Sequence, residues 1–251
     1  MPNLPLHIMT SYRVSQLLGE EFVTEENLGF CLLGSTVPDI RAMTKNPRSK
    51  THFTELSVID IGEGVSQMLN DYPQIRIECQ ESPKMKAFIC GYISHLICDE
   101  TWITQIYRPV FSEEFRQCSE IESNMWDRAL QLELDSISLT EIKSNALIDL
   151  LPDDITGINL EFVDSEDLKT WTSWVVDLVN RDFSWDRLHN AMNRMYRNDS
   201  DVQHSVSDFI GDIHNNLTSV HRLFTGDILD WYLSNTVNQS VSVIKESLIE
   251  N

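Results

Sequence analysis

A long stretch without an internal proline limits the fold of this chain more than any other feature. The residues from Pro83 to Pro109 hold no proline between them, and apolar side chains fill much of the stretch. Such a segment predicts a buried helix. It carries His95 and Asp99, four positions apart. Residues at i and i+4 share one helix face, about 5–6 Å apart at Cβ, so the two side chains can reach a common point.

A histidine and an aspartate inside an apolar helix need a partner, because an unpaired buried charge is costly. A divalent cation held by His95 and Asp99 would satisfy both side chains. A hydrogen bond between them, with no metal, would do so too. The helix alone leaves both interpretations open.

The helical period continues through the rest of the chain, and windows that alternate with a period of two are rare. We therefore predict an all-α, multi-helix bundle that forms a single domain over residues 1–251, a length that can bury a sizeable core. Irregular structure is expected at the basic segment 41–51, which contains Pro47, and at 152–164. The expected helices, besides 83–109, cover residues 6–18, 28–33, 52–71, 115–134, 139–151, 168–179, 185–196, 202–224 and 228–248.

The charge is strongly acidic and unevenly distributed. The formal net charge is −20; residues 112–251 carry 26 acids and 10 bases, and residues 1–111 carry 13 acids and 9 bases. This balance argues against a nucleic-acid partner and against binding to anionic membrane surfaces. One segment is an exception, because it concentrates basic residues without any acid between them: Arg41, Lys45, Arg48 and Lys50.

The cysteines and the absence of targeting segments indicate a cytoplasmic protein. The chain has five cysteines without Cys-x-x-Cys spacing, which predicts reduced thiols rather than disulfides or a thiolate zinc site. We find neither a signal peptide nor an apolar run of membrane-spanning length, so no stable membrane insertion is expected. The sequence leaves the oligomeric state open.

The first hundred residues contain three histidines, His7, His52 and His95. Asp39 stands where a helix is expected to end at Pro38, at the mouth of the basic segment. Imidazole and carboxylate ligands together are what catalytic zinc prefers. A shared metal site is therefore a hypothesis that only the three-dimensional arrangement can test.

Four motifs occur in order along the first 102 residues: Met1-Pro2-Asn3-x-x-x-His7, Leu33-Gly34-Ser35-x-x-Pro38-Asp39-Ile40, Thr51-His52-Phe53 and Gly91-Tyr92-x-Ser94-His95-x-x-x-Asp99-x-x-Trp102. Together they resemble the zinc-dependent phospholipase C family. The family is all-helical and includes bacterial phospholipases C and the related zinc-type single-strand nucleases. The resemblance covers about residues 1–111, the expected metal-binding half, whereas 112–251 carries no recognisable motif and would complete the bundle as an acidic helical half.

The resemblance implies a set of metal ligands. Asp39, His52, His95 and Asp99 would hold one zinc ion, and Asp99 would bridge to a second ion that His7 also binds. One or two Zn²⁺ ions are thus expected, with other divalent metals as alternatives.

Two further ligand positions of the family are less well matched. In the secreted enzymes the mature N-terminal amine also binds zinc, which would need Pro2 as the first residue here. The histidines of their third zinc site are missing from the expected place, since no histidine lies between Trp102 and Asp186. The candidates for a rebuilt site are His204 and Asp208, spaced i, i+4, with Asp212 and His214, although solvated or capping roles explain them as well.

The substrate implied by the family is a small-molecule or lipid-like phosphoester, cleaved by a metal-activated water. Asp39 and Arg41 are the candidate catalytic residues, and Asp39 would orient or deprotonate this water. Arg41, two residues later, is the strongest candidate for binding the phosphate, because a guanidinium binds phosphate in a bidentate manner. Lys45 and Arg48 are further candidate substrate contacts, and a solvated basic loop is the alternative.

Aromatic residues near the proposed ligands allow two interpretations. Tyr92 and Trp102 lie close to His95 in sequence, and they would either wall a substrate cleft or pack against neighbouring helices. Trp171, Trp174 and Trp185 are expected in the core or in a lid rather than in a substrate platform.

Three functional hypotheses follow. The first is a zinc-dependent, phospholipase C-like phosphodiesterase acting on a small or zwitterionic substrate. The second is a biosynthetic tailoring metalloenzyme that uses the same site for another hydrolysis, elimination or cyclisation, since a fold does not fix a function. The third is a non-catalytic helical protein whose acidic C-terminal half binds a partner.

Overall fold

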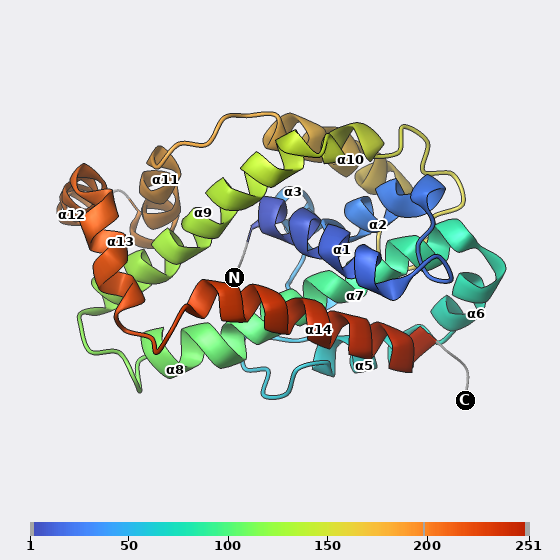
Figure 1. Ribbon diagram of the computed structural model, residues 1–251, viewed down its shortest axis with the longest axis horizontal. Coiled ribbons are helices and arrows are strands. Elements are labelled where there is room, and N and C mark those ends of the chain that lie inside the picture. The colour runs from blue at the N-terminus through green and yellow to red at the C-terminus, as the bar shows by residue number, and fades with distance from the viewer. Residues whose placement is uncertain (1–2, 198, 249–251) are drawn as a thin grey trace.

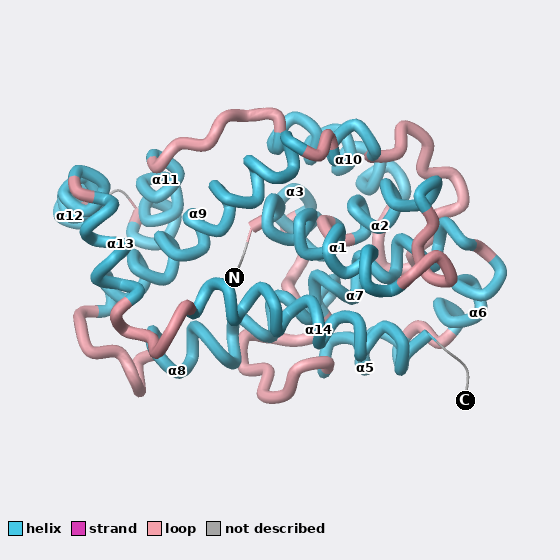
Figure 2. Tube along the Cα trace, in the orientation of Figure 1, coloured by secondary structure: helices cyan, strands magenta, loops and turns pink. Residues whose placement is uncertain are grey.

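The computed structural model describes residues 3–197 and 199–248, and the described chain is helical with short connections (Figures 1 and 2). Within these ranges the extended pairing is a single bridge between Leu160 and Val163. The predicted all-α fold is confirmed. The elements are α1 (Leu4–Leu18), η1 (Glu25–Asn27), α2 (Leu28–Gly34), η2 (Val37–Ile40), α3 (Arg41–Thr44), α4 (Ser49–His52), α5 (Glu63–Asp71), α6 (Gln74–Glu81), α7 (Pro83–Thr101), η3 (Trp102–Tyr107), α8 (Arg108–Phe111), α9 (Glu120–Ser144), η4 (Leu147–Leu150), α10 (Ser165–Val179), α11 (Asp186–Tyr196), α12 (Ser200–Gly211), α13 (Ile213–His221) and α14 (Ile228–Leu248).

Helix α7 lies at the centre of the fold, where α1, α2 and α14 pack against it (Figure 1). Every residue from Ala87 to Thr101 is buried, as predicted for this segment. The helix begins with Pro83, where a missing N–H costs nothing, and the Ser82 side chain caps it by accepting a hydrogen bond from the Met85 N–H. It continues through a wider turn, η3, into α8. Its buried middle carries His95 and Asp99.

One predicted helix, 52–71, is wrong over half of its length, residues 53–62. The chain leaves the helical conformation at Phe53, which has φ 61°, and α5 begins only at Glu63, after Gly62 with φ 100°. The carboxylate of Glu100 accepts hydrogen bonds from the N–H groups of Gly62 and Gly64 at 2.6 and 2.7 Å. This tertiary contact with α7 fixes the turn, and no local pattern reveals it.

Other boundaries also differ from those predicted. The basic segment 41–51 is not irregular throughout but forms the short helices α3 and α4. The two helices predicted at 115–134 and 139–151 are one, α9, which a capping box at Ser119 and Glu122 starts late. The helix predicted over 202–224 is interrupted at Asp212. Residues 152–164 are a loop, as expected.

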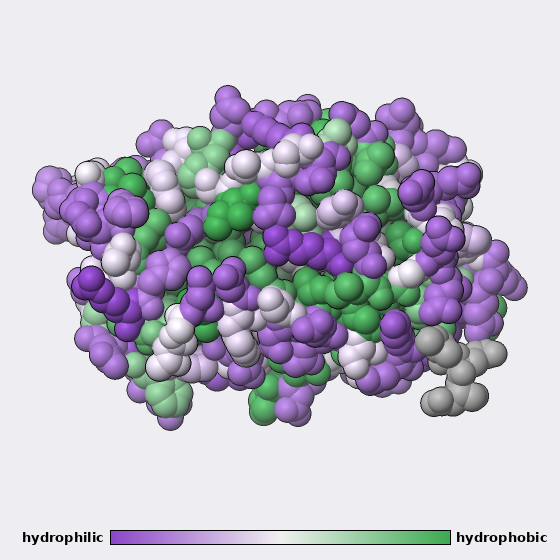
Figure 3. Space-filling model, viewed as in Figure 1, coloured by the Kyte–Doolittle hydropathy of each residue, from purple (hydrophilic) through white to green (hydrophobic). Residues whose placement is uncertain are grey.

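Two apolar clusters form the core, and each includes residues from both halves of the sequence. One surrounds α1, α2 and the first part of α7 and also takes in Trp171 of α10; the other surrounds Trp102, α9 and the helices α11–α13. Hydrophilic residues cover most of the face shown in Figure 3. No described helix combines the length and apolar character that crossing a membrane requires.

Glycine lets α2 approach α7 closely enough to place a carbonyl at the site described below. A Cβ atom added to Gly91 would lie 1.8 Å from the Cys31 carbonyl oxygen. We expect Gly91→Ala to lower the free energy of unfolding by roughly 3 kcal/mol, because backbone must move. The control Gly211→Ala meets open space and should leave stability unchanged or raise it by up to about 1 kcal/mol. Urea unfolding of the two variants measures the difference, and equal losses would argue against a tight crossing.

Candidate metal centre

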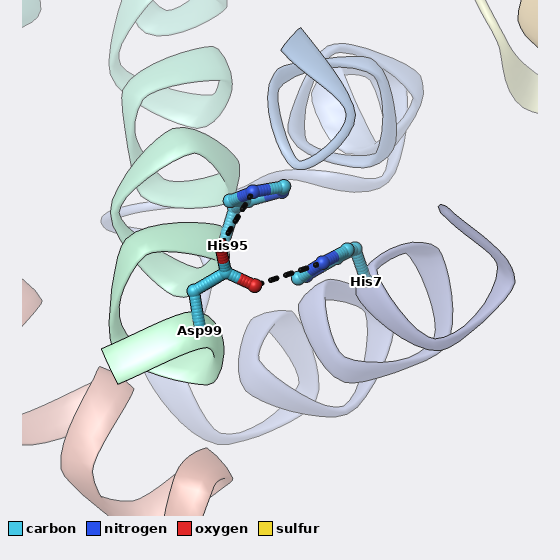
Figure 4. A group of neighbouring side chains, drawn as sticks. All are labelled: His7, His95 and Asp99. Carbon is cyan, nitrogen blue, oxygen red and sulfur yellow. Dashed lines mark ion pairs between the residues drawn. The ribbon is translucent and has the colours of Figure 1, made fainter. Parts of the chain in front are cut away.

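Four separate elements bring the five proposed ligands together. His7 comes from α1, Asp39 from η2, His52 from α4, and His95 and Asp99 from α7. Figure 4 shows His7 facing the His95 and Asp99 side chains across the gap between α1 and α7. Four of the five are buried, whereas the Asp39 side chain is 27% exposed. Asp39 is therefore the ligand candidate that solvent or a substrate can reach.

Around His52 Nε2, the ligand atoms of His95, Asp99 and Asp39 lie at distances close to those within a tetrahedral zinc site. His52 Nε2 lies 3.3 Å from His95 Nε2, 3.3 Å from Asp99 Oδ2 and 3.6 Å from Asp39 Oδ1. His95 Nε2 lies 3.8 Å from Asp99 Oδ2. Tetrahedral zinc with bonds of about 2.0–2.1 Å separates its ligand atoms by about 3.3 Å. The donor set and the spacing both fit zinc.

Hydrogen bonds orient the two histidines of this group. His95 Nδ1 lies 2.7 Å from the Ser35 carbonyl, which only accepts, so Nδ1 carries the proton. Thr51 donates its hydroxyl proton to the Pro38 carbonyl at 2.7 Å, which leaves its oxygen to accept from His52 Nδ1 at 3.3 Å. Both Nε2 atoms then present lone pairs to each other at 3.3 Å. Facing lone pairs repel unless a cation lies between them, so this pairing fits a shared metal.

His7 lies beside this group, and its ring stacks on the His95 ring with centroids 3.7 Å apart. Its Nε2 atom lies 3.5 Å from Asp99 Oδ1, the oxygen that His52 does not approach. Three buried atoms of this group, both ring nitrogens of His7 and Asp99 Oδ1, have no hydrogen-bond partner among the described residues. Buried polar atoms are rarely left in this state, so they fit a second ion. Pro2, the proposed terminal ligand, lies outside the described residues.

The charge states suit metal binding. Burial, followed by the nearby His95, lowers the pKa of His7 to about 3. Burial also lowers the pKa of His95 to about 3, so both rings are neutral at pH 7. Burial alone would raise the pKa of Asp99, but Arg48, followed by His52 and His95, outweighs it and holds the pKa well below its ordinary value. Neutral imidazoles and an ionised carboxylate are the forms that bind zinc.

Arg48 occupies a different place from the one predicted. Its side chain is only 6% exposed, and Nη2 donates to Asp99 Oδ2 at 2.9 Å. The prediction that Arg48 contacts the substrate conflicts with this burial. Arg48 instead compensates the charge of Asp99 and fixes the orientation of its carboxylate.

The predicted cleft aromatics are packing residues. Tyr92 is fully buried and donates its hydroxyl proton to the Thr51 carbonyl. Trp102 is fully buried and donates from Nε1 to Asp127 Oδ1 at 2.9 Å. Neither side chain reaches an open surface, which favours the packing alternative over a substrate contact.

A cavity of about 920 Å³ opens beside the ligands, and Asp39, Arg41 and Lys45 line it. Asp39 therefore faces the same cavity as Arg41 and Lys45, two of the basic residues predicted to contact the substrate. Arg41 is half-buried, with Nε donating to the Asn46 carbonyl at 3.4 Å, and Lys45 is exposed.

The opposite walls come from the C-terminal half and supply basic residues that the sequence analysis missed. One signal was available: Arg187 and Arg194 are seven residues apart in α11, which places them two turns apart on one face. The missed residues are Arg128, Arg181, Arg187 and Arg194.

The remaining histidines do not extend the site. His204 and Asp208 lie 3.8 Å apart, but their side chains are 82% and 73% exposed. Over the described part of the chain, groups of three or more potential ligands occur only among the five residues of the centre. His189 pairs with Gln203 and His221 with Glu133, each at 2.8 Å, consistent with structural roles.

The family model for zinc-dependent phospholipase C matches residues 6–145, more than half of the chain. The chain belongs to the zinc-dependent phospholipase C family. The matched range contains all five proposed ligands and extends through α9, beyond the 111 residues that carry the motifs. No curated protein and no solved structure matches the chain.

One buried carboxyl group near the cavity should make stability depend on pH. Asp135 of α9 accepts a hydrogen bond from Asn3 Nδ2 at 2.6 Å, and burial raises its pKa to about 7. Between about pH 4 and 7 the folded protein keeps a proton that the unfolded chain loses, so stability falls as pH rises. The contribution approaches about 1.4 kcal/mol per pH unit. Urea unfolding from pH 4.5 to 7.5 should show a smaller loss for Asp135→Asn than for the unaltered protein, and parallel profiles would exclude this role for Asp135.

Proposed function

We propose that this protein is a zinc-dependent phosphodiesterase of the phospholipase C type, which hydrolyses a phosphoester with an activated water. One observation carries the proposal. Around His52 Nε2, the ligand atoms of His95 and Asp99 lie at 3.3 Å and that of Asp39 at 3.6 Å, close to the spacing within a zinc site. The group borders a cavity lined by basic side chains, which suits an anionic phosphoester.

Bound zinc would supply a Lewis acid that polarises the phosphoryl group and lowers the pKa of a water molecule toward neutrality. His7, Asp39, His52, His95 and Asp99 would hold the ions in this proposal. Arg48 keeps the Asp99 carboxylate ionised and oriented. The Ser35 carbonyl and the Thr51 hydroxyl hold the rings of His95 and His52.

Asp39 and Arg41 face the substrate in this proposal. Asp39 is the partly exposed ligand, so its carboxylate can orient the attacking water and accept its proton. Arg41 lines the same cavity, where its guanidinium can bind two phosphoryl oxygens and stabilise the charge that develops on them.

The test is hydrolysis of bis(p-nitrophenyl) phosphate by the protein after chelation and after zinc is restored. We expect turnover only in the zinc-loaded protein. Arg41→Met should lower kcat/KM by about 10-fold or more, the effect of losing a charge-assisted contact. Lys50→Met is the matched control, because Lys50 is an exposed base of the same segment that does not line the cavity. Bound zinc without turnover of any phosphodiester would favour the tailoring-enzyme alternative.

The remaining expectations concern the setting of the enzyme. All five cysteines are free thiols, which supports a reducing compartment such as the cytoplasm. The net charge of −20 supports a small-molecule or lipid-like substrate rather than a nucleic acid.

A further inference from the structure

The cavity beside the metal centre is larger than a simple phosphodiester needs. Its volume of about 920 Å³ lies near the top of the range of roughly 300–1,000 Å³ for small-molecule sites. Asp39 and Arg41 line one part of it, and residues of α9, α10 and α11 line another. A substrate that fills it extends from the metal ligands to the C-terminal half.

The charge of the cavity is opposite to that of the chain. The chain has 39 acidic and 19 basic residues, yet the cavity is lined by six basic residues and two acidic ones, Asp39 and Asp135. Five of the six bases, all except Arg128, form no ion pair with a carboxylate within the described residues. Gathering like charges costs free energy that a bound anion would recover. The six are Arg41, Lys45, Arg128, Arg181, Arg187 and Arg194.

The cavity has more basic residues than are needed to neutralise one phosphodiester. A single phosphodiester carries one negative charge, which Arg41 and the proposed metal ions would already neutralise. Arg187 and Arg194 lie on one face of α11, about 10 Å apart along its axis. With Arg181, which precedes α11, they are arginines that the C-terminal half contributes to the cavity lining.

The same cavity has an apolar strip. Trp174 is 36% exposed, and its ring stacks on the buried Trp171 ring with centroids 4.8 Å apart at 22°. Met195, which is 42% exposed, and Leu178 also line the cavity. Large apolar side chains at the surface beside charged ones suit a ligand with both an apolar part and charged groups.

We propose that the substrate is an amphipathic phosphoester with a second anionic group, a phosphate or a carboxylate, which Arg181, Arg187 and Arg194 bind. This rests on the proposed phosphodiesterase function and names its substrate class. The scissile phosphoester lies at Asp39 and Arg41, the apolar part lies against Trp174, and the second anion lies at α11. A zwitterionic substrate with a quaternary ammonium group is disfavoured, because basic residues outnumber acidic ones six to two in the lining.

The test compares three p-nitrophenyl alkyl phosphodiesters whose chains end in a carboxylate, a hydroxyl or a trimethylammonium group. With the zinc-loaded full-length protein, we expect kcat/KM to be at least 10-fold higher for the carboxylate than for the hydroxyl. The ratio should fall toward one in Arg187→Met/Arg194→Met. The control Arg197→Met should keep the full ratio, because Arg197 follows α11 directly but does not line the cavity. The preference should also weaken with added salt.

Equal kcat/KM values for the carboxylate and the hydroxyl, or a preference for trimethylammonium, would overturn the proposal. A carboxylate preference that survives in the double variant would also overturn it, because the preference would then arise elsewhere.

Failure of the phosphodiesterase function is distinguishable from failure of this inference. If no diester is hydrolysed, equilibrium binding of the same three compounds, followed by tryptophan fluorescence, takes the place of kcat/KM. Tighter binding of the carboxylate, lost in the double variant and kept in Arg197→Met, would support the anion site without the reaction. Equal binding of all three compounds would reject it.

Discussion

Replacing His95 by glutamine should remove both zinc binding and hydrolysis. His95 Nε2 lies 3.3 Å from His52 Nε2 and 3.8 Å from Asp99 Oδ2, so it borders both halves of the proposed centre. Losing a residue that only orients a ligand costs about 10- to 100-fold in metal affinity, so losing a ligand should cost at least 100-fold. Glutamine can still donate to the Ser35 carbonyl, which limits the effect on folding. Zinc titration and phosphodiester turnover measure the two losses.

The matched control is His204→Gln. His204 and Asp208 have the same i, i+4 spacing as His95 and Asp99, but they lie on the surface of α12. Their contribution to zinc affinity and turnover should be negligible. Equal effects of the two substitutions would mean that the buried cluster is not the metal site.

Replacing Arg48 by methionine should produce the largest loss of stability in the zinc-free protein. The Arg48–Asp99 pair is almost fully buried, with a 2.9 Å contact and side chains 6% and 1% exposed. Removing one partner of a buried pair leaves an uncompensated charge, which typically costs about 3–5 kcal/mol. Urea unfolding at pH 7 measures the loss. Zinc should restore part of it, because the ions would take over the neutralisation of Asp99.

Arg13→Met provides the comparison. Arg13 pairs with Glu141 at 2.8 Å, but both side chains are about one-third exposed. Solvent screens such a pair, so its loss should cost less than about 1 kcal/mol. A similar loss in both variants would indicate that Arg48 does not compensate a buried charge.

The parts of the structure that the sequence predicted are those with a local signal. The apolar period revealed the buried helix α7, and the i, i+4 spacing placed His95 and Asp99 on one of its faces. His7, Asp39 and His52 were found through short motifs whose resemblance to the family supplied the tertiary information that spacing lacks. The structure brings all five side chains together.

The parts that were not predicted depend on contacts between distant segments. The start of α5 is set by hydrogen bonds to Glu100, which lies 36 and 38 positions further along the chain than the two glycines that it holds. Arg48 looks like any base of a polar loop until Asp99 is placed beside it. Tyr92 and Trp102 could not be assigned to a cleft or to the core, because an aromatic residue on a helix face suits both.

The arginines that the C-terminal half contributes to the cavity were missed for a different reason. The C-terminal half is acidic overall, and its average charge conceals four basic residues that line one cavity. Charge averaged over a segment reports solubility and long-range attraction rather than the lining of a particular site.

Zinc-edge anomalous diffraction from crystals of the zinc-loaded protein tests the metal centre most directly. We expect a strong peak within about 2.1 Å of the Nε2 atoms of His52 and His95, and a second peak beside His7 if two ions bind. Ordered protein with no peak among His7, Asp39, His52, His95 and Asp99, or with zinc only at surface residues such as His204, would contradict the proposed site and the chemistry assigned to it.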